Sequence, residues 1–518
     1  MSSSPNRRLI LKAGAAGAAT AGASALGLSG CASLAAPPGE PEMLAMSSSE
    51  AIAAIRGGRM SAERYVTVAV DRAERLRDLN AFIAIDRAGA IAQARRVDAM
   101  RAGGASLPPL AGLPIVVKDN INTRDLPTTG GTAALRNVRP SANAPTLQKL
   151  VDAGAIVIAK TNLHELAFGI TSTNLSAFAG PVKNPYDRSR IPGGSSGGTA
   201  VAIATRVVAS GLGTDTGGST RVPAALCGIV GLRPSVGNGG AQRRYDGAGV
   251  VPISHTRDTV GPMGRTVADV ALLDAVITGA TAIVATPLAG MRIGIPASFW
   301  AGLEADVAAV ATAARTRLTA AGVTFVEVDV VGLAALNEKV SFPVALHEPI
   351  ADIRAYLAAT GVTGIGVADI AAQIASPDVK GAFGAIQGDV AGPGYNDAIR
   401  VHRPQMQRVY SNYFAGNRLE AMMFPTTVAP AVPIDPVAGS GKFRLNGAEV
   451  ETFQTFIRNT DPGSNAGIPG LALPAGMTPG GLPVGLEIDG PLGTDRRLIA
   501  IGLAFEAVLG SVRPPPGI

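Results

Sequence analysis

Residues that usually bind metals or form disulfides are scarce in this sequence. Cysteine occurs only twice in 518 residues, at Cys31 and Cys227, and histidine occurs four times. Two cysteines cannot build a disulfide framework or a cysteine metal site, and the histidines are too scattered along the chain for metal-ligand spacing. We therefore expect no metal centre and no other cofactor. The histidines are His164, His255, His347 and His402.

A strong charge imbalance is also absent. The formal net charge is +6, from 45 basic and 39 acidic residues, and Arg7, Arg8 and Lys12 contribute three of the positive charges before Cys31. So small and dispersed an excess gives no support to nucleic-acid binding. We expect no nucleic-acid partner.

A convincing transmembrane segment is missing near the start, because the apolar run at residues 13–28 is short and rich in glycine. Residues 1–31 instead resemble an export signal. Arg7 and Arg8 lie in a stretch similar to a twin-arginine motif, and residues 28–31 resemble a bacterial lipobox, in which Cys31 receives lipid and becomes the mature N-terminus. The alternative is ordinary cleavage near residues 23–25 and release as a soluble protein.

These features predict export across the bacterial inner membrane, giving a periplasmic or envelope-anchored protein. Contact with a membrane is then expected only through a lipid on Cys31. Residues 32–46 contain a proline-rich stretch and are interpreted as a tether. We place one folded domain at residues 47–518, because no linker or internal repeat divides that part of the chain.

Apolar residues, in contrast, are plentiful and make up 47% of the sequence. In the middle of the chain, residues 291–295 have a strand pattern, 306–320 an amphipathic helical pattern, and 323–328 a second strand pattern. Such alternation predicts an α/β architecture with a mostly parallel or mixed sheet. A chain of this length and composition can bury a large core.

Local signals predict further elements. Ser47 and Glu50 have the spacing of a capping box at the start of a short helix, and a longer helix is expected at residues 61–77. Between residues 330 and 418 the pattern loosens, which predicts either a lid or pocket wall or an ordinary helical excursion. Further strands are expected at 113–117, 155–159, 421–425, 471–474 and 483–488, and a last helix capped by Thr494.

A glycine- and serine-rich run at residues 192–223 carries the strongest functional signal. It contains two glycine-bracketed serines, Ser195 and Ser219, separated by the apolar stretch 201–212. Glycine at this density is costly unless the backbone needs unusual dihedrals or must approach a ligand closely. The apolar stretch is typical of a buried helix followed by a strand, which argues against a flexible linker or a pair of surface turns.

One interpretation makes Ser195 the nucleophile, because residues 193–197 match the G-x-S-x-G elbow of α/β-hydrolases. That elbow requires a strand immediately before the serine. Residues 187–192 are charged and end in proline, so they do not suit a central strand. The alternative is that both serines act together with Lys118, which follows the strand expected at 113–117.

Several blocks of sequence identify the chain as resembling the amidase signature family. The resemblance covers residues 47 to about 509, with the signature core at about 112–265. It implies a single large α/β domain with a central mixed β-sheet covered by helices on both faces. The matching blocks are residues 112–120, 193–198, 213–224, 228–235, 425–427, 465–469 and 481–486.

By this resemblance Ser219 is the nucleophile, Ser195 a bridging serine and Lys118 the base of a Ser-Ser-Lys triad that acts through an acyl-enzyme. The peptide bond between Gly194 and Ser195 is then expected to be cis. The residue types suit the chemistry, because a free serine is a poor nucleophile and needs a base. Lysine accepts a proton only when neutral, so we expect Lys118 to be desolvated, with a lowered pKa.

The small residues before the nucleophile are expected to form an oxyanion hole. Backbone N–H groups of consecutive small residues can turn toward one point, where negative charge develops during attack. The donors assigned are the amides of Thr216, Gly217, Gly218 and Ser219.

Three neighbouring residues are expected to support the site rather than react. Asp215 and Arg221 are placed to pair across the loop that carries the nucleophile. Ser196 either hydrogen-bonds within the relay or fills the turn. His255 is expected to be structural. Its surroundings, residues 251–258, resemble the indoleacetamide and mandelamide hydrolases of the family. This resemblance suggests an arylacetamide substrate only weakly, because just 4% of the chain is aromatic.

The expected function is therefore serine-dependent hydrolysis of a small-molecule carboxamide, releasing ammonia or an amine and a carboxylate, by a monomer or homodimer. Esters and carbamates stay open as substrates. Two alternatives remain: an amidotransferase subunit that generates ammonia from glutamine, which the export signal opposes, and a binding lipoprotein with a relict site.

Overall fold

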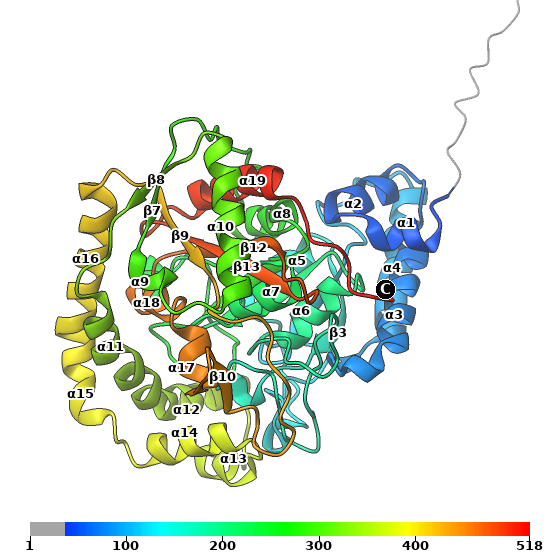
Figure 1. The fold of residues 1–518 in the computed structure, drawn as a ribbon. Helices are drawn as coiled ribbons and strands as arrows, with labels where there is room; N and C mark the ends of the chain where they lie inside the picture. The colour runs from blue at the N-terminus through cyan, green and yellow to red at the C-terminus, as the bar shows by residue number, and fades with distance from the viewer. Residues whose placement is uncertain (1–36, 518) are drawn as a thin grey trace, which may run out of the picture. The chain divides into compact units, whose positions relative to one another are not determined.

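An eleven-stranded sheet runs through the protein, whose computed structural model describes residues 37–517 (Figure 1). The strands lie in the order β1-β3-β2-β4-β6-β5-β12-β13-β9-β7-β8. β2 pairs in parallel with β3 and β4, β7 pairs in parallel with β8 and β9, and the remaining pairs are antiparallel. The sheet is therefore mixed, as the sequence predicts.

The strand bounds follow the short apolar runs of the sequence. They are β1 Phe82–Ile85, β2 Pro114–Lys118, β3 Ile156–Thr161, β4 Ser210–Asp215, β5 Val230–Arg233, β6 Thr259–Gly264, β7 Arg292–Ile295, β8 Thr324–Glu327, β9 Ala421–Pro425, β12 Gly470–Met477 and β13 Pro483–Asp489, with a separate hairpin of β10 Lys442–Leu445 and β11 Ala448–Glu451.

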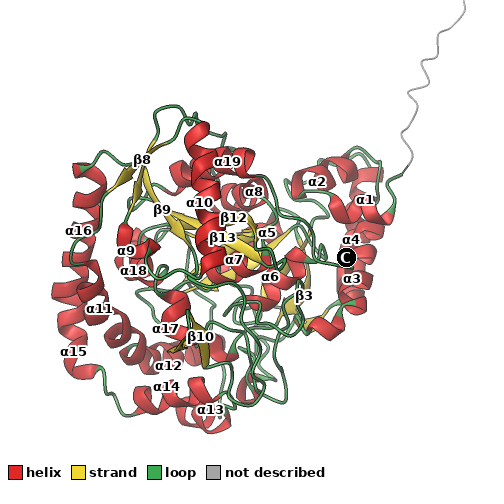
Figure 2. Cartoon of the chain, in the orientation of Figure 1, coloured by secondary structure: helices red, strands yellow, loops and turns green. Residues whose placement is uncertain are grey.

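Helices cover both faces of the sheet, because successive side chains of each strand point to opposite sides. In β2, Val116 belongs to a core packed by α3, α4 and α6, whereas Ile115 and Val117 belong to another packed by α5 and α8. Figure 2 shows α10 lying across β12 and β13, which it contacts. These helices are α3 Ala62–Arg75, α4 Arg87–Ala102, α5 Pro145–Asp152, α6 Gly197–Ala204, α8 Val267–Thr278 and α10 Ala305–Ala320.

The remaining helices complete the cover. They are α1 Glu40–Ala45, α2 Ser48–Arg56, α7 Arg221–Cys227, α9 Ala297–Trp300, α11 Leu333–His347, α12 Pro349–Thr360, α13 Val367–Gln373, α14 Pro377–Gln387, α15 Gly392–Asp397, α16 Arg403–Gly416, α17 Thr452–Ile457, α18 Asp461–Ala466 and α19 Asp495–Leu509.

The N-terminal end of the fold differs from the expected boundary. The folded unit begins at Pro37, inside the segment 32–46 predicted as a tether. Residues 40–45 form α1 and bury Met43 and Leu44 against the core, so apolar side chains override the proline-rich local signal. The export signal at 1–31 and the lipid site at Cys31 lie outside the described residues.

Two capping predictions have different outcomes. Ser47 and Glu50 form the predicted capping box of α2. α19 begins after Thr494 as expected, but the Thr494 hydroxyl donates to the Pro491 carbonyl instead of accepting from the helix. Among residues 37–517, none of the helices is both long and apolar enough to span a bilayer.

The region 330–418 is helical and contains α11 to α16 (Figure 1). α11 contacts α14, α15 and α16, and apolar side chains of α12, α13 and α14 share one core cluster. Because these helices also face the segment around Leu166 and Phe168, they lie close to the chain that follows β3. Helices in this position can form one wall of a pocket near that segment.

Candidate active site

The predicted base and both serines meet where two parallel strands end. β2 and β4 are neighbours, with Val117 opposite Leu212, and their carboxyl ends deliver Lys118 and Asp215 to the same edge of the sheet. Ser195 lies in the loop just before α6, and the bond between Gly194 and Ser195 is cis as predicted. Topology thus joins residues that are far apart in the sequence.

Lys118 is held inside the protein by two hydroxyl groups. Its Nζ atom lies 2.7 Å from Ser195 Oγ and 2.8 Å from Thr214 Oγ1, and the side chain is fully buried. Burial lowers the pKa of Lys118 to about 7, although the charges of Asp215 and Asp258 oppose that shift. Near neutral pH a substantial fraction of Lys118 is therefore uncharged and able to accept a proton.

Ser219 lies at the wall of a cavity. It is 7% exposed, and the cavity has a volume of about 260 Å³. Its carbonyl oxygen accepts a hydrogen bond from the Ser196 amide at 3.2 Å, which ties the two serine loops together. The structure thus brings Ser219, Ser195 and Lys118 into one region, with only Ser219 reaching the cavity.

The loop of expected oxyanion-hole donors is shaped by a glycine that tolerates no side chain. Gly218 has φ near +137°, and a Cβ there would collide with Thr460. Its N–H donates to Asp215 Oδ1 at 3.0 Å, so this donor is already engaged. The amides of Gly217 and Ser219 have no hydrogen-bond acceptor among residues 37–517, and Thr216, Gly217 and Ser219 all line the cavity.

Asp215 organises the loop through buried charge. Its carboxylate accepts from Arg221 at 3.0 and 3.1 Å and from Arg233 at 3.0 Å. Burial opposes ionisation, but the two guanidinium groups outweigh it and hold the pKa of Asp215 well below its usual range. The expected pairing of Asp215 with Arg221 is present, whereas the contribution of Arg233 was not foreseen.

Ser196 bonds to the strand rather than to the relay. Its hydroxyl donates to the Thr214 carbonyl at 3.2 Å and lies 3.3 Å from the Thr214 amide, which donates to it. It therefore links the loop before α6 to the end of β4. Of the two roles left open for this residue, the structure favours holding the turn.

A second loop supports the site and was not recognised in the sequence. The half-buried carboxylate of Asp258 accepts from the Thr216 hydroxyl at 2.6 Å and from the amides of Ile253 and Ser254. Burial raises the pKa of Asp258. Ile253 and Ser254 are its neighbours in the chain, whereas Thr216 is brought to it by the pairing of β4 with β6.

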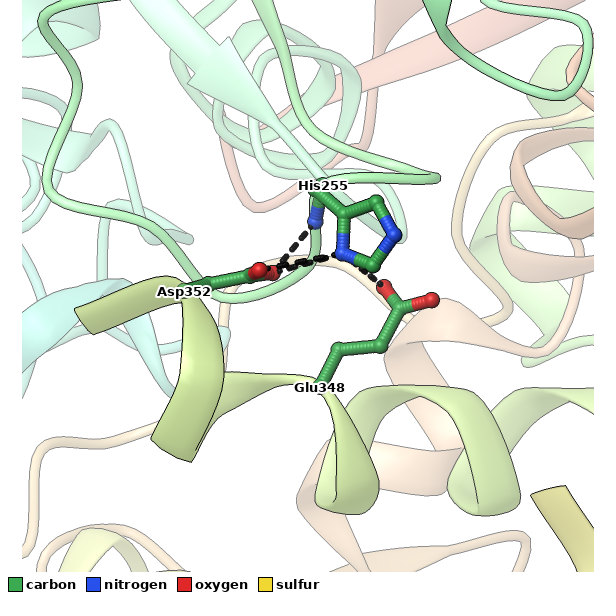
Figure 3. Close-up of side chains that lie close together, drawn as sticks. All are labelled: His255, Glu348 and Asp352. Carbon is green, nitrogen blue, oxygen red and sulfur yellow. Dashed lines mark hydrogen bonds and ion pairs between the residues drawn. The ribbon is translucent and has the colours of Figure 1, made fainter. Parts of the chain in front are cut away.

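His255 anchors that same loop to α12 (Figure 3). Its Nδ1 atom lies 3.0 Å from Asp352 Oδ1 and 3.5 Å from Glu348 Oε2, and the hydrogen bond with Asp352 raises its pKa. These three residues offer metal-ligand atoms within 4.8 Å of one another. A protonated imidazole between two carboxylates balances their charge without a metal, so the cluster is adequately explained as an ion pair. This agrees with the structural role predicted for His255.

The cavity beside Ser219 is walled by the region 330–418, which confirms the prediction of a pocket wall there. α11 contributes Phe342 and Leu346, and α14 contributes Asp378. The segment after β3 contributes residues 167–171. Apolar side chains predominate in the lining: Phe168, Ile170, Ile253, Phe342, Leu346, Phe453 and Ile457.

Comparison with known proteins assigns this geometry to a family. The family model described as Amidase matches residues 64–499. The chain belongs to the amidase family. This amidase is 44% identical to an indoleacetamide hydrolase of Agrobacterium vitis over 448 residues, covering 86% of this chain and 93% of the relative. It is 39% identical to a mandelamide hydrolase of Pseudomonas putida over 489 residues, covering 91% and 93%.

Solved structures agree with the amidase fold. A crystal structure described as an amidase superimposes with a TM-score of 0.78 at 32% identity, covering 90% of this chain and all of the other. The native peptide amidase from Stenotrophomonas maltophilia superimposes with a TM-score of 0.76 at 28% identity, covering 91% and 98%. This amidase is accordingly an amide-hydrolysing enzyme with a single large α/β domain.

Proposed function

We propose that this amidase cleaves its substrate through an acyl-enzyme on Ser219, with Ser195 and Lys118 as a proton relay. The single observation that carries the proposal is the 2.7 Å contact between Lys118 Nζ and Ser195 Oγ, buried behind a serine that lines the cavity. A lysine with a pKa of about 7 suits general base catalysis at neutral pH.

In the first half-reaction, Ser219 loses its hydroxyl proton to Ser195 while Ser195 passes its own proton to neutral Lys118. Ser219 Oγ bonds to the amide carbon, and the oxyanion accepts hydrogen bonds from Gly217 and Ser219, with Thr216 alongside. When the intermediate collapses, the C–N bond breaks and the proton returns through Ser195 to the leaving nitrogen. Removing one oxyanion donor typically costs about 10²–10³ in turnover.

In the second half-reaction, water attacks the acyl ester. The relay removes a proton from that water, and the C–O bond to Ser219 then breaks. The proton returns to Ser219, and the carboxylic acid leaves. Lys118 and both serines end in their starting protonation states, so each turnover consumes one water and releases one amine or ammonia.

The substrate class we propose is a small arylacetamide with a primary amide. Relatives named indoleacetamide hydrolase and mandelamide hydrolase support this class. The cavity supports it independently, because about 260 Å³ lies at the small end of ligand pockets and three phenylalanines line it. Esters and carbamates would enter the same acyl chemistry and belong in the same substrate panel.

For location, we propose export by the twin-arginine route, on the strength of Arg7, Arg8 and the lipobox-like residues 28–31. An exported enzyme would meet its amides outside the cytoplasm. This placement also separates it from the amidotransferase alternative, whose work is cytosolic.

The deciding experiment compares wild type with Ser219→Ala on phenylacetamide, indole-3-acetamide, matched esters and glutamine, measuring ammonia and acid release. We expect wild type to hydrolyse arylacetamides, Ser219→Ala to be inactive, and the exposed control Ser411→Ala to keep wild-type rates. A fluorophosphonate should label Ser219 in wild type alone. Retained activity in Ser219→Ala refutes the mechanism; absence of labelling and turnover in wild type favours the relict site, and turnover of glutamine alone favours the amidotransferase.

A further inference from the structure

Acidic side chains outnumber basic ones in the lining of the cavity beside Ser219. Arg257 is the one basic residue in its lining, and it is paired with Asp461 and also donates to backbone carbonyls of Thr216 and Ser341. Two other carboxylates remain, Asp378 and Glu451. Glu451 is exposed, so solvent screens it, whereas Asp378 is mostly enclosed.

Asp378 is held in a built setting at the first turn of α14. Its side chain is 31% exposed, and Oδ2 lies 3.0 Å from Nε2 of His164, whose ring is fully buried. The amide of Val379 donates to Oδ1 at 2.9 Å. Burial opposes ionisation of Asp378, but His164 and the backbone N–H groups outweigh it and keep the pKa of Asp378 below its usual value.

His164 connects this carboxylate to the catalytic loop. Its Nδ1 atom lies 3.3 Å from the Thr171 hydroxyl, and its backbone amide donates to the Ser195 carbonyl at 3.2 Å. A side chain at Gly169 would collide with the imidazole ring. The chain is therefore packed closely around His164, and Asp378 is fixed relative to the residues that react.

Aromatic rings surround the same space. Phe342 and Phe453 line the cavity with ring centroids 6.5 Å apart. Phe168 also lines the cavity and packs edge-on against Phe383, with ring centroids 5.1 Å apart. Phe383 belongs to α14, the helix that also carries Asp378. The cavity therefore offers an aryl group of a substrate both aromatic side chains to pack against and a fixed carboxylate.

We propose that Asp378 is a specificity-determining residue that accepts a hydrogen bond from an N–H or O–H group on the aromatic portion of the substrate. This inference rests on the proposed arylacetamide function. An ionised carboxylate has about four acceptor positions, and its two recorded partners leave positions for a ligand. Substrates whose ring edge carries an indole-like N–H are favoured, and those whose ring carries an acid are repelled by Asp378.

The test uses two amides that differ at one atom: indole-3-acetamide, whose ring donates an N–H, and benzothiophene-3-acetamide, whose ring sulfur cannot. A hydrogen bond to a charged acceptor is worth about 10- to 100-fold in affinity. We expect wild type to prefer the indole by about that factor in kcat/KM, mainly through KM. Asp378→Leu removes the acceptor and should bring the ratio close to one, and Asp378→Asn, which keeps a neutral acceptor oxygen, should lower it. Asp397→Asn, exposed on α15 and outside the cavity, keeps the wild-type ratio.

Binding to Ser219→Ala, measured by calorimetry, separates this inference from the proposed function. If wild type hydrolyses neither amide, the arylacetamide function fails, and the dissociation constants for Ser219→Ala and its double variants with Asp378→Asn still report whether Asp378 selects the donor. The inference is overturned if wild type does not discriminate between the two amides, or if the Asp378 variants discriminate as wild type does. Melting temperatures near that of wild type show that the variants are folded.

Discussion

Lys118 Nζ lies 2.7 Å from Ser195 Oγ, although 77 positions separate the two residues in the chain. The contact forms because β2 ends at Lys118, next to the parallel strand β4 whose Thr214 hydroxyl also holds the amine. Since no carboxylate among residues 37–517 is hydrogen-bonded to the amine, burial dominates its protonation. The same contact supports the proposed relay.

The first prediction concerns the pH dependence of turnover. A base must be neutral, and the pKa of Lys118 is about 7, so kcat/KM should rise with pH and reach half its plateau near pH 7. Below that pH, protonated Lys118 cannot accept the proton of Ser195. Initial rates between pH 5 and 9 measure this rise of kcat/KM with pH. Lys118→Met should lower kcat by at least about 10²-fold, within the range of general base catalysis. A flat profile across pH 7 would contradict the assignment.

The second prediction is that Asp258→Asn shifts the pH at which kcat/KM reaches half its plateau. The negative charge of Asp258 raises the pKa of Lys118, so removing it should move the half-maximal point to lower pH. The Ile253 and Ser254 amides both donate to the same oxygen of Asp258, and the side-chain oxygen of asparagine can accept both hydrogen bonds, so the plateau of kcat/KM should change little. Asp152→Asn, the same substitution at an exposed residue, should leave that half-maximal pH unchanged. Movement toward higher pH would refute the electrostatic argument.

The third prediction concerns stability. Arg221→Met leaves the buried carboxylates of Asp215 and Glu487 without a shared partner, and breaking a buried pair in this way costs about 3–5 kcal/mol. We expect a clearly lower denaturation midpoint in urea together with loss of activity. Arg95→Ala breaks an exposed pair with Glu63 and should barely change the midpoint. Equal midpoints for the two variants would show that the Asp215 network is not important for stability.

The fourth prediction tests the proposed export. Replacing Arg7 and Arg8 by lysine should retain the protein in the cytoplasm, because twin-arginine export depends on both arginines. Cys31→Ser should still be exported but should appear in the soluble periplasmic fraction rather than with membranes. Fractionation with immunoblotting distinguishes these outcomes. If Cys31→Ser fractionates as wild type does, lipid anchoring is excluded; if both arginine replacements leave export unchanged, the twin-arginine route is excluded.

The sequence alone determined the family, the α/β class and most of the strands, because those signals are local. Glycine-bracketed serines, the strand leading to Lys118 and the capping box of α2 are each encoded within a few neighbouring residues. Hydrophobic periodicity likewise predicted α10 within one residue of its start and at its observed end. The strands β1, β5, β6, β10 and β11 were not predicted, and α1 was not predicted because its residues lie in the proline-rich stretch interpreted as a tether.

Only the tertiary structure decided how the site is charged and what faces the substrate. Asp258 and Arg233 acquire their partners through strand pairing and loop packing, and His164 meets Asp378 across more than two hundred residues of chain. Burial, which depends on all the packed elements together, sets the pKa of Lys118, and the contact with His164 holds Asp378 as a charged group in the cavity. Such contacts leave no periodic or local trace in the sequence, because they depend on the spatial neighbours of a residue and not on its neighbours in the chain.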